Sequence, residues 1–393
     1  MRERHALGIL FLTLFLVMLG VGIIIPNLAY RAGELRATPF EIGLLFTLYS
    51  LMQFIFAPFW GRLSDRIGRK PVLLLGLMGN AAGLLLFAAA PGLPLLYAAR
   101  GLSGLMSSAA LPTAMAYVAD LTDESGRGRG MGLMGAAMGL GFIFGPAIGG
   151  LLSRFGHAVP FLVAGALNAA TCLLAALLLV ESLATRPADA APAARPALRS
   201  VFRSPLLPFY GVAFFVTFAM AALEAVFPLY LHDRFGLGAE AMGVMFLFMG
   251  TAVVAVQAGL LGRAIGALGE ERVMFLGLWI NALGLLLVTG AAGRTSLAAA
   301  LVVSGVGNQI MRPANASLIS KRATGGRGAA IGTMDAFDSA GRILGPLAAS
   351  ALYPLDPRAP YVASALILLA AASGLRMWRA RAAEGPVPPQ GEA

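Results

Sequence analysis

Charged residues are scarce in this sequence. They make up 12% of the 393 residues, whereas a soluble domain carries ~25%. So few charges cannot cover the surface of a water-soluble protein of this length, and 58% of the residues are hydrophobic. The composition therefore excludes a soluble enzyme, a disordered chain and a secreted disulfide scaffold. It indicates that most of the chain faces lipid or other apolar helices.

Cysteine and histidine are also scarce. Cys172 is the one cysteine, so the chain offers no internal disulfide and no cysteine-based metal site. The histidines His5, His157 and His232 lie far apart and lack metal-ligand spacing. The sequence contains no catalytic cluster and no phosphate-binding loop, so we expect neither an enzyme nor an ATP-driven pump. We expect no metal and no cofactor.

Long apolar runs are abundant. Crossing the ~30 Å hydrocarbon core takes about 20 apolar residues in a helix, and helices satisfy their backbone groups without water. Twelve segments have this length: 6–29, 40–60, 71–91, 94–119, 130–152, 158–181, 206–231, 239–261, 272–292, 296–319, 328–353 and 359–379. The sequence therefore predicts an all-α membrane protein with twelve transmembrane helices.

The basic residues predict the orientation of these helices. With the N-terminus inside, the inner loops and tails hold 20 lysines and arginines, and the outer loops hold six. Because such residues are enriched in cytoplasmic loops, we expect both termini in the cytoplasm. The net charge of +10 lies mostly in these loops, so a membrane explains it better than nucleic acid does. Lysine is scarce, whereas Ala and Gly are abundant, and this composition is typical of GC-rich codon usage. It favours a prokaryotic protein, which would lie in the plasma membrane.

One long polar stretch divides the chain. Residues 183–205 are rich in Ala, Pro and Arg, without hydrophobic periodicity, and this predicts a flexible cytoplasmic linker. We expect an N-terminal six-helix bundle at 1–182 and a C-terminal one at 206–380. A cytoplasmic tail follows at 381–393.

The two halves repeat with an offset near 200. The matches include Gly61 with Gly262, Asn80 with Asn281, Pro112 with Pro313, and Gly145-Pro146 with Gly345-Pro346. Two parallel repeats imply a pseudo-two-fold axis along the membrane normal and a midplane site between the halves. This architecture favours a transporter that works by alternating access.

The most specific pattern is the loop between segments 40–60 and 71–91. It reads Gly61-Arg-Leu-Ser-Asp65-Arg66-Ile-Gly68-Arg69-Lys70. This loop resembles the signature loop of the major facilitator superfamily. The resemblance implies a cytoplasmic gate in which Asp65 and Arg66 stabilise the outward-open state. In the second copy Gly266 replaces the Asp, and Glu270-Glu271 replace Arg69-Lys70, so we expect an asymmetric gate.

Further motifs resemble the twelve-helix drug:proton antiporter, or multidrug efflux, branch of that superfamily. Segment 130–152 carries the motif Gly141, Gly145, Pro146, Gly149 and Gly150. The resemblance implies that this motif bends the helix and limits leakage.

Segments 94–119 and 6–29 carry the other two motifs of that branch. Arg100-Gly-Leu-Ser-Gly104, with Asp120 at the cytoplasmic end of its helix, is similar to a motif whose arginine is implicated in proton coupling. Pro26 and Asn27 belong to a string that also looks like these exporters.

Six charged residues fall inside predicted helices. They are Arg100, Glu224, Arg312, Asp335, Asp338 and Arg342. A charge at the bilayer centre costs roughly 2.5–3.5 kcal/mol even on the lenient insertion scale, so such residues indicate function. The spacing predicts an Asp338–Arg342 pair on one helix face, and Asp335 is within reach of Arg312.

The acids among these residues are candidates for proton coupling. Glu224 has no partner within its helix, and a carboxyl group in an apolar cavity can exchange a proton near neutral pH. We rank Glu224 first and Asp335 second, with Asp338 as a third candidate. Arg100, Arg312 and Arg342 are their expected charge partners.

Methionine and aromatic side chains indicate the substrate class. Flexible Met and aromatic surfaces suit varied hydrophobic ligands. The candidate cavity residues are Pro26, Asn27, Phe218, Met220, Phe227, Met245 and Met138. Together with the resemblance to drug:proton antiporters, this lining leads us to expect a monomeric exporter of amphipathic or lipophilic small molecules that uses a proton gradient as its energy source. An importer or symporter of a small metabolite and a lipid or lysolipid translocase on the same fold remain as alternatives.

Overall fold

The computed structural model describes residues 2–122, 127–182, 201–323 and 326–384. Most of the linker expected at 183–205 and of the tail expected at 381–393 lies outside the described residues. Every secondary-structure element in the described part is helical, which confirms the all-α prediction. The last helix extends beyond the boundary expected at residue 380.

The first half of the chain forms seven α-helices and a short 3-10 helix. They are α1 (Arg2–Glu34), α2 (Pro39–Ile67), α3 (Arg69–Ala89), α4 (Leu93–Ser107), α5 (Ala110–Leu121), α6 (Arg127–Leu152), η1 (Ser153–Phe155) and α7 (Val159–Leu178). α4 and α5 follow one another as a single span that is interrupted at Ser108 and Ala109. Pro112 explains the break, because it has no N–H to donate to the Ser108 carbonyl.

The second half follows the same order. Its elements are α9 (Leu207–Phe235), α10 (Ala239–Val256), the π-helical turn η2 (Gln257–Leu261), α11 (Gly262–Leu268), α12 (Glu270–Gly290), α13 (Arg294–Arg322), α14 (Arg327–Leu352) and α15 (Ala359–Glu384). α10, η2 and α11 together form one span.

Ten helical segments among the described residues are long and apolar enough to cross a membrane. Of the twelve expected segments, 296–319 and 328–353 are not among these ten. They correspond to α13 and α14. Their mean hydropathy is low because of polar and charged residues, which include Asn308, Gln309 and Arg312 in α13 and Asp335, Asp338 and Arg342 in α14.

Local sequence signals explain where helices begin and end. The Thr38 hydroxyl accepts a hydrogen bond from the Glu41 N–H at 3.3 Å, and Glu41 accepts one from the Thr38 N–H at 2.8 Å. This capping box starts α2. Gly68 separates α2 from α3 with a φ of +109°, a conformation that side chains with a Cβ rarely adopt.

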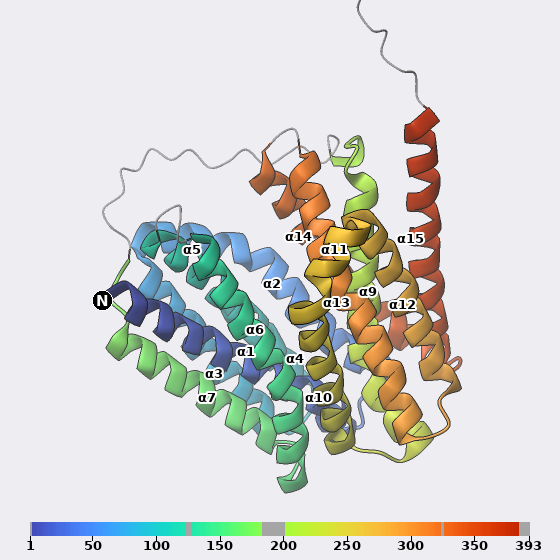
Figure 1. Ribbon diagram of the computed structural model, residues 1–393. Coiled ribbons are helices and arrows are strands. Elements are labelled where there is room, and N and C mark those ends of the chain that lie inside the picture. The colour runs from blue at the N-terminus through green and yellow to red at the C-terminus, as the bar shows by residue number, and fades with distance from the viewer. Residues whose placement is uncertain (1, 123–126, 183–200, 324–325, 385–393) are drawn as a thin grey trace, which may run out of the picture.

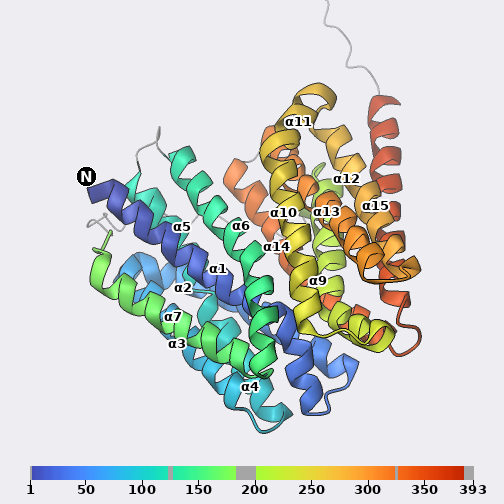
Figure 2. The ribbon, with the colours of Figure 1, turned by 60° about the horizontal axis from the view of Figure 1, so that its bottom comes forward.

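Two groups of helices lie side by side. In Figures 1 and 2, α1 to α7 lie on the left and α9 to α15 on the right. Equivalent pairs of helices contact each other in both groups: α1 packs on α6 as α9 packs on α14, and α3 packs on α7 as α12 packs on α15. The two groups meet chiefly where α6 contacts α10 and where α2 contacts α14.

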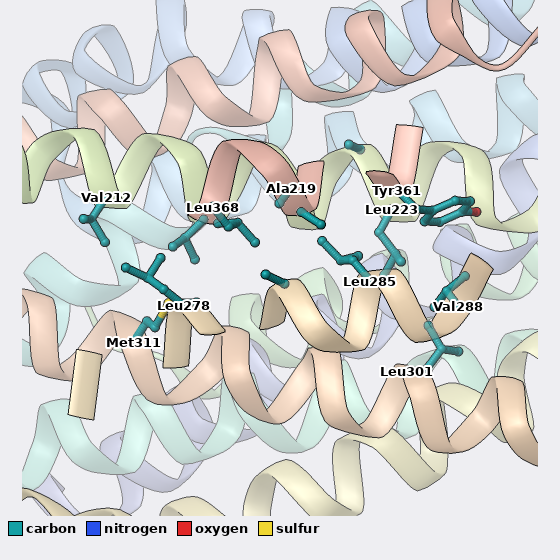
Figure 3. Packing of buried hydrophobic residues seen from close by; sticks show 14 of the residues in the cluster. Val212, Ala219, Leu223, Leu278, Leu285, Val288, Leu301, Met311, Tyr361 and Leu368 are labelled. Atoms are coloured by element: carbon teal, nitrogen blue, oxygen red, sulfur yellow. The ribbon is translucent and has the colours of Figure 1, made fainter. Parts of the chain in front are cut away.

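The largest buried cluster fills the second group. It includes Val212 and Leu223 of α9, Leu285 of α12 and Leu368 of α15, as Figure 3 shows. Since lipid is as apolar as these side chains, their close packing, rather than exclusion from water, stabilises the helix contacts.

Candidate functional site

A cavity of about 1500 Å³ lies between the two groups of helices. Its walls come from α1, α2 and α4 to α6 on one side, with small contributions from α3, and from α9, α13 and α14 on the other. All three acids that line it, Glu224, Asp335 and Asp338, belong to the second half. The acidic wall is therefore on one side only.

The cavity is closed at one end by contacts between the halves. Gly150 of α6 lies against the start of α10, where an added Cβ would be 2.7 Å from the Ala239 carbonyl oxygen. The Tyr30 hydroxyl is 3.1 Å from the carbonyl oxygens of both Pro228 and Leu237. We call this end, which carries Tyr30, η1 and the start of α10, the sealed end.

Two further contacts join the halves at the sealed end. The Thr47 hydroxyl of α2 donates to the Ile343 carbonyl of α14 at 2.8 Å. Arg154 of η1 forms an exposed ion pair with Glu240 of α10. At the opposite end, where the 61–70 loop lies, Val201 and Gly328 are among the cavity-lining residues. The cavity therefore extends toward that end, which we call the gate-loop end.

Arg312 links the acids of α14. Its Nη2 atom lies 3.5 Å from Asp335 Oδ1 and 3.3 Å from Asp338 Oδ2. The Thr217 hydroxyl of α9 donates to Asp338 Oδ1 at 2.7 Å. The expected contact between Asp335 and Arg312 is therefore present. The Asp338–Arg342 pair expected from the spacing is not formed among the described residues, because Asp338 turns toward Arg312 and Thr217.

Glu224 of α9 also lines the cavity, and it stands apart from that network. Within the described part of the chain, no hydrogen bond or ion pair engages its carboxyl group. Arg342 is the charged side chain with an electrostatic influence on it, although the two do not form an ion pair. Glu224 is thus a cavity-lining acid that no described residue engages in a hydrogen bond or ion pair.

Arg100 lies on the opposite wall, in α4. Only 5% of it is exposed, and its guanidinium stacks over the Tyr49 ring at 4.4 Å. Its Nε atom donates to the Leu45 carbonyl of α2 at 3.4 Å. No acid among the described residues pairs with it.

The apolar candidates divide into two sets. Met138 and Met220 line the cavity. The other candidates are not among its lining residues: Pro26, Asn27, Phe218, Phe227 and Met245. Phe227 and Met245 instead belong to the packed core of the second half, and the Asn27 side chain donates to its own helix at 2.8 Å. Sequence alone could not separate these sets, because a Met or Phe on a helix suits either environment.

The gate loop forms a network within the first half. Arg69 pairs with Asp65 at 2.6 Å and with Asp120 at 3.0 Å. It also donates to the Ser64 hydroxyl at 2.7 Å. Arg66 is exposed, and no ion pair among the described residues joins it or Asp65 to the second half. Gly61, expected in the loop, lies inside α2, and an added Cβ there would have no atom within 4 Å.

Glu181 belongs to this network, and sequence reasoning missed it. Its carboxylate accepts hydrogen bonds from the backbone N–H groups of Arg69 at 2.8 Å and Lys70 at 3.1 Å. It thereby caps the start of α3, where free N–H groups and the helix dipole favour a negative charge. The one signal in the sequence was that Glu181 is an acidic residue at the end of an apolar segment and had no other assigned role.

The second half contains the same ion pair with its charges exchanged. Glu270 of α12 pairs with Lys321 of α13, as Arg69 of α3 pairs with Asp120 of α5. Both members lie 201 positions further along the chain, from 69 to 270 and from 120 to 321. Asp65 has no acidic equivalent, since Gly266 occupies that place, so the two networks are asymmetric.

The glycines of the 141–150 motif bring helices together. An added Cβ on Gly141 would lie 2.6 Å from the Phe15 carbonyl oxygen, and one on Gly145 would lie 2.6 Å from the Cα of Gly22. These two glycines therefore pack α6 on α1, while Gly150 packs it on α10 of the other half. Pro146 lies inside α6, and Gly149 contacts Ile23 of α1.

Comparisons with known proteins agree with one another. A family model described as the Major Facilitator Superfamily matches residues 10–268 and 252–393. Multidrug resistance protein 1 of Bacillus subtilis (strain 168) is 29% identical over 387 residues, which cover 97% of this chain and 98% of that protein. The class G tetracycline resistance protein of Vibrio anguillarum is 33% identical over 358 residues, covering 89% and 91%. The crystal structure of the nucleoside transporter NupG matches with a TM-score of 0.79 at 13% identity, covering 95% of this chain and 98% of that one.

Proposed function

The chain belongs to the major facilitator superfamily, and we propose that it is a proton-coupled antiporter that exports amphipathic or lipophilic small molecules. The same proposal includes twelve transmembrane helices in two six-helix bundles, with both termini in the cytoplasm of a prokaryotic cell. It includes a monomer that needs no cofactor. The likeness to multidrug and tetracycline resistance proteins supports export over the importer and translocase alternatives.

One observation carries the proposal. Glu224 lies in a large cavity that is closed at one end, and no described residue pairs with it. A carboxyl group that can change its charge inside the substrate cavity couples proton binding to substrate binding. The apolar lining, with Met138 and Met220, supports lipophilic substrates.

The proposed cycle follows from the change in charge of Glu224 when it binds or releases a proton. In the outward-open state Glu224 takes up a proton from outside, and the neutral acid favours the inward-open state. We assign the structure to that inward-open state, because the cavity extends toward the gate-loop end and contacts between the halves close the sealed end. Substrate then enters from the cytoplasm as the proton leaves. Asp335, held by Arg312, is the second candidate carrier, since its charge also changes the balance of the network.

The gate loop, residues 61–70, acts when the transporter is in the outward-open state. In the structure Asp65 and Arg69 are held within the first half. When the gate-loop end closes, we expect Asp65 and Arg66 to contact the second half and stabilise the outward-open state. The 141–150 motif keeps α6 tight against α1 throughout, which limits leakage of protons.

Transport in sealed vesicles tests the proposal. Purified protein in liposomes is given an imposed pH gradient, and the movement of a lipophilic cation, a neutral dye and a labelled lipid is followed. We expect proton influx to drive the dye or the cation outward. The antiporter proposal fails if no member of the panel moves outward, and uptake or lipid movement would instead favour an importer or a translocase.

Variants of the acids test the proton site. Glu224→Gln removes the titratable group with little change in size, and we expect it to abolish gradient-driven transport while counterflow of substrate continues. Glu34→Gln, an exposed acid paired with Arg31 and not among the cavity-lining residues, is the matched control. If Glu224→Gln and Asp335→Asn both keep the wild-type pH dependence, the assignment of the proton site is overturned.

A further inference from the structure

Arg100 is a cation without a carboxylate partner, buried in the wall of the cavity. It is 5% exposed and lines the cavity from the first half. The other deeply buried arginine in the described residues, Arg69, is paired with Asp65 and Asp120. Because moving a charge out of water is costly unless it is paired, this difference calls for a partner that the chain does not supply.

The hydrogen-bond donors of Arg100 are largely unused. A guanidinium carries several N–H donors and no acceptor. Only Nε has a partner among the described residues, the Leu45 carbonyl at a long 3.4 Å. Tyr49 covers one face of the group at 4.4 Å and offers no negative charge in its neutral form. The terminal nitrogens, which present the fork that matches a carboxylate, therefore remain available.

Neighbouring side chains make this wall polar without adding an acid. Gln53 lines the cavity beside Arg100, and its amide donates to the Tyr49 hydroxyl at 3.1 Å and to the Ser107 hydroxyl at 3.2 Å. No carboxylate of the first half is among the lining residues, so nothing on this wall competes for Arg100. The acids Glu224, Asp335 and Asp338 lie on the facing wall.

We propose that Arg100 forms a subsite for the carboxylate of an amphipathic substrate, whose apolar part lies along the Met-lined cavity. This inference rests on the proposed export function and narrows its substrate class to compounds with an acidic group. A carboxylate can accept two parallel hydrogen bonds from the guanidinium, and such charge-assisted pairs are stronger than neutral ones. A basic group on the same compound would face Glu224 and the acids of α14, so zwitterions fit both walls.

A purely structural role for Arg100 makes a different prediction. The contact with Leu45 and the stacking on Tyr49 join α4 to α2. If Arg100 served only to hold these helices, its replacement would lower stability and weaken every ligand alike. A carboxylate subsite requires that the loss be specific to ligands with an acidic group.

Equilibrium binding without a proton gradient separates these roles. The probes are a dansyl-labelled undecanoic acid and its methyl ester, titrated into the purified full-length protein at one neutral pH. We expect the wild type to bind the acid at least about tenfold more tightly than the ester, as for a charged hydrogen-bonded pair. Arg100→Gln should remove this preference by lowering the affinity for the acid, while the affinity for the ester stays unchanged. Arg100→Lys should keep part of the preference.

Arg31→Gln is the matched control. Arg31 is a partly buried arginine that donates to the Ala88 and Ala90 carbonyls and is not among the cavity-lining residues. We expect it to leave the ratio of the two affinities unchanged. Melting temperatures of all variants show whether they are folded, and Arg100→Lys provides a second readout if Arg100→Gln is not.

The inference is overturned if the wild type binds the acid and the ester equally, or if Arg100→Gln keeps the preference. Its failure is distinct from failure of the export function. If the gradient drives export of a cation but the acid is not bound more tightly than the ester, the subsite proposal alone is refuted. A preference that depends on Arg100, without gradient-driven export, would remove the antiporter proposal alone.

Discussion

Gly150 is the position at which a single added side chain should open the sealed end. An added Cβ there would lie 2.7 Å from the Ala239 carbonyl oxygen and 3.1 Å from the Cα atoms of Glu240 and Gly243. All three are backbone atoms of α10, so no side chain can rotate away to make room. A Gly150→Val substitution therefore pushes α6 and α10 apart, and these helices belong to different halves.

The size of the effect follows from where the strain applies. Overpacking a well-packed contact costs about 1–3 kcal/mol. The strain exists only while the sealed end is closed, because the outward-open state of the proposed cycle separates α6 from α10. A cost of about 2 kcal/mol would therefore shift the equilibrium between the two states by roughly 30-fold toward outward-open.

Distances between spin labels measure this shift. Cys172 is the only cysteine, so a Cys172→Ala background allows labels at Arg36→Cys and Arg358→Cys. These positions follow α1 and precede α15, at the sealed end of each half. We expect Gly150→Val to increase the population with a long label-to-label distance.

A second glycine of α6 provides the control. Gly132 has no atom within 4 Å of an added Cβ, so Gly132→Val should leave the distances as in the wild type. An unchanged distance distribution in a folded Gly150→Val protein would refute the reasoning, because the backbone contact would then not be what closes this end. An equal change in both variants would refute it too.

Two other predictions concern charged groups. Glu181→Ala removes the carboxylate that caps α3, and we expect it to cost about 1 kcal/mol, as loss of a helix cap does, seen as a lower melting temperature. Asp338→Asn leaves Arg312 paired with Asp335, so its effect on stability should be small. Adding Asp335→Asn leaves Arg312 without either acid, and the double variant should lose more stability than the sum of the single ones, measured by thermal unfolding.

The sequence predicted what depends on composition and on short segments. The apolar runs placed the helices, because a span in lipid must be long and apolar. The same rule explains why α13 and α14, although expected as spans, are not among the ten sufficiently apolar segments. Arg312 and the acids of α14 contribute to their low hydropathy. Asp335 was correctly expected beside Arg312. Asp338 was assigned to Arg342 because helix spacing considers one helix at a time, whereas Thr217 reaches it from α9.

Contacts between the halves were beyond sequence reasoning. Gly150 belongs to a motif whose first glycines pack on α1 of the same half, and nothing in its spacing distinguishes a glycine that faces the other half. The repeat offset relates equivalent positions, but it does not say how two repeats pack on each other. Tyr30 illustrates the same limit, since it contacts Pro228 and Leu237 through main-chain carbonyls that any residue could supply.

The exchanged ion pair shows what the repeat does specify. Arg69 with Asp120 and Glu270 with Lys321 occupy equivalent places with opposite signs. The fold therefore fixes that an ion pair joins these helix ends, while either sign satisfies it. Asp65 is different, because the second half has no counterpart. The recurring ion pair is thus the structural part of the gate loop, and Asp65, which the repeat does not reproduce, is the part that we propose acts in gating.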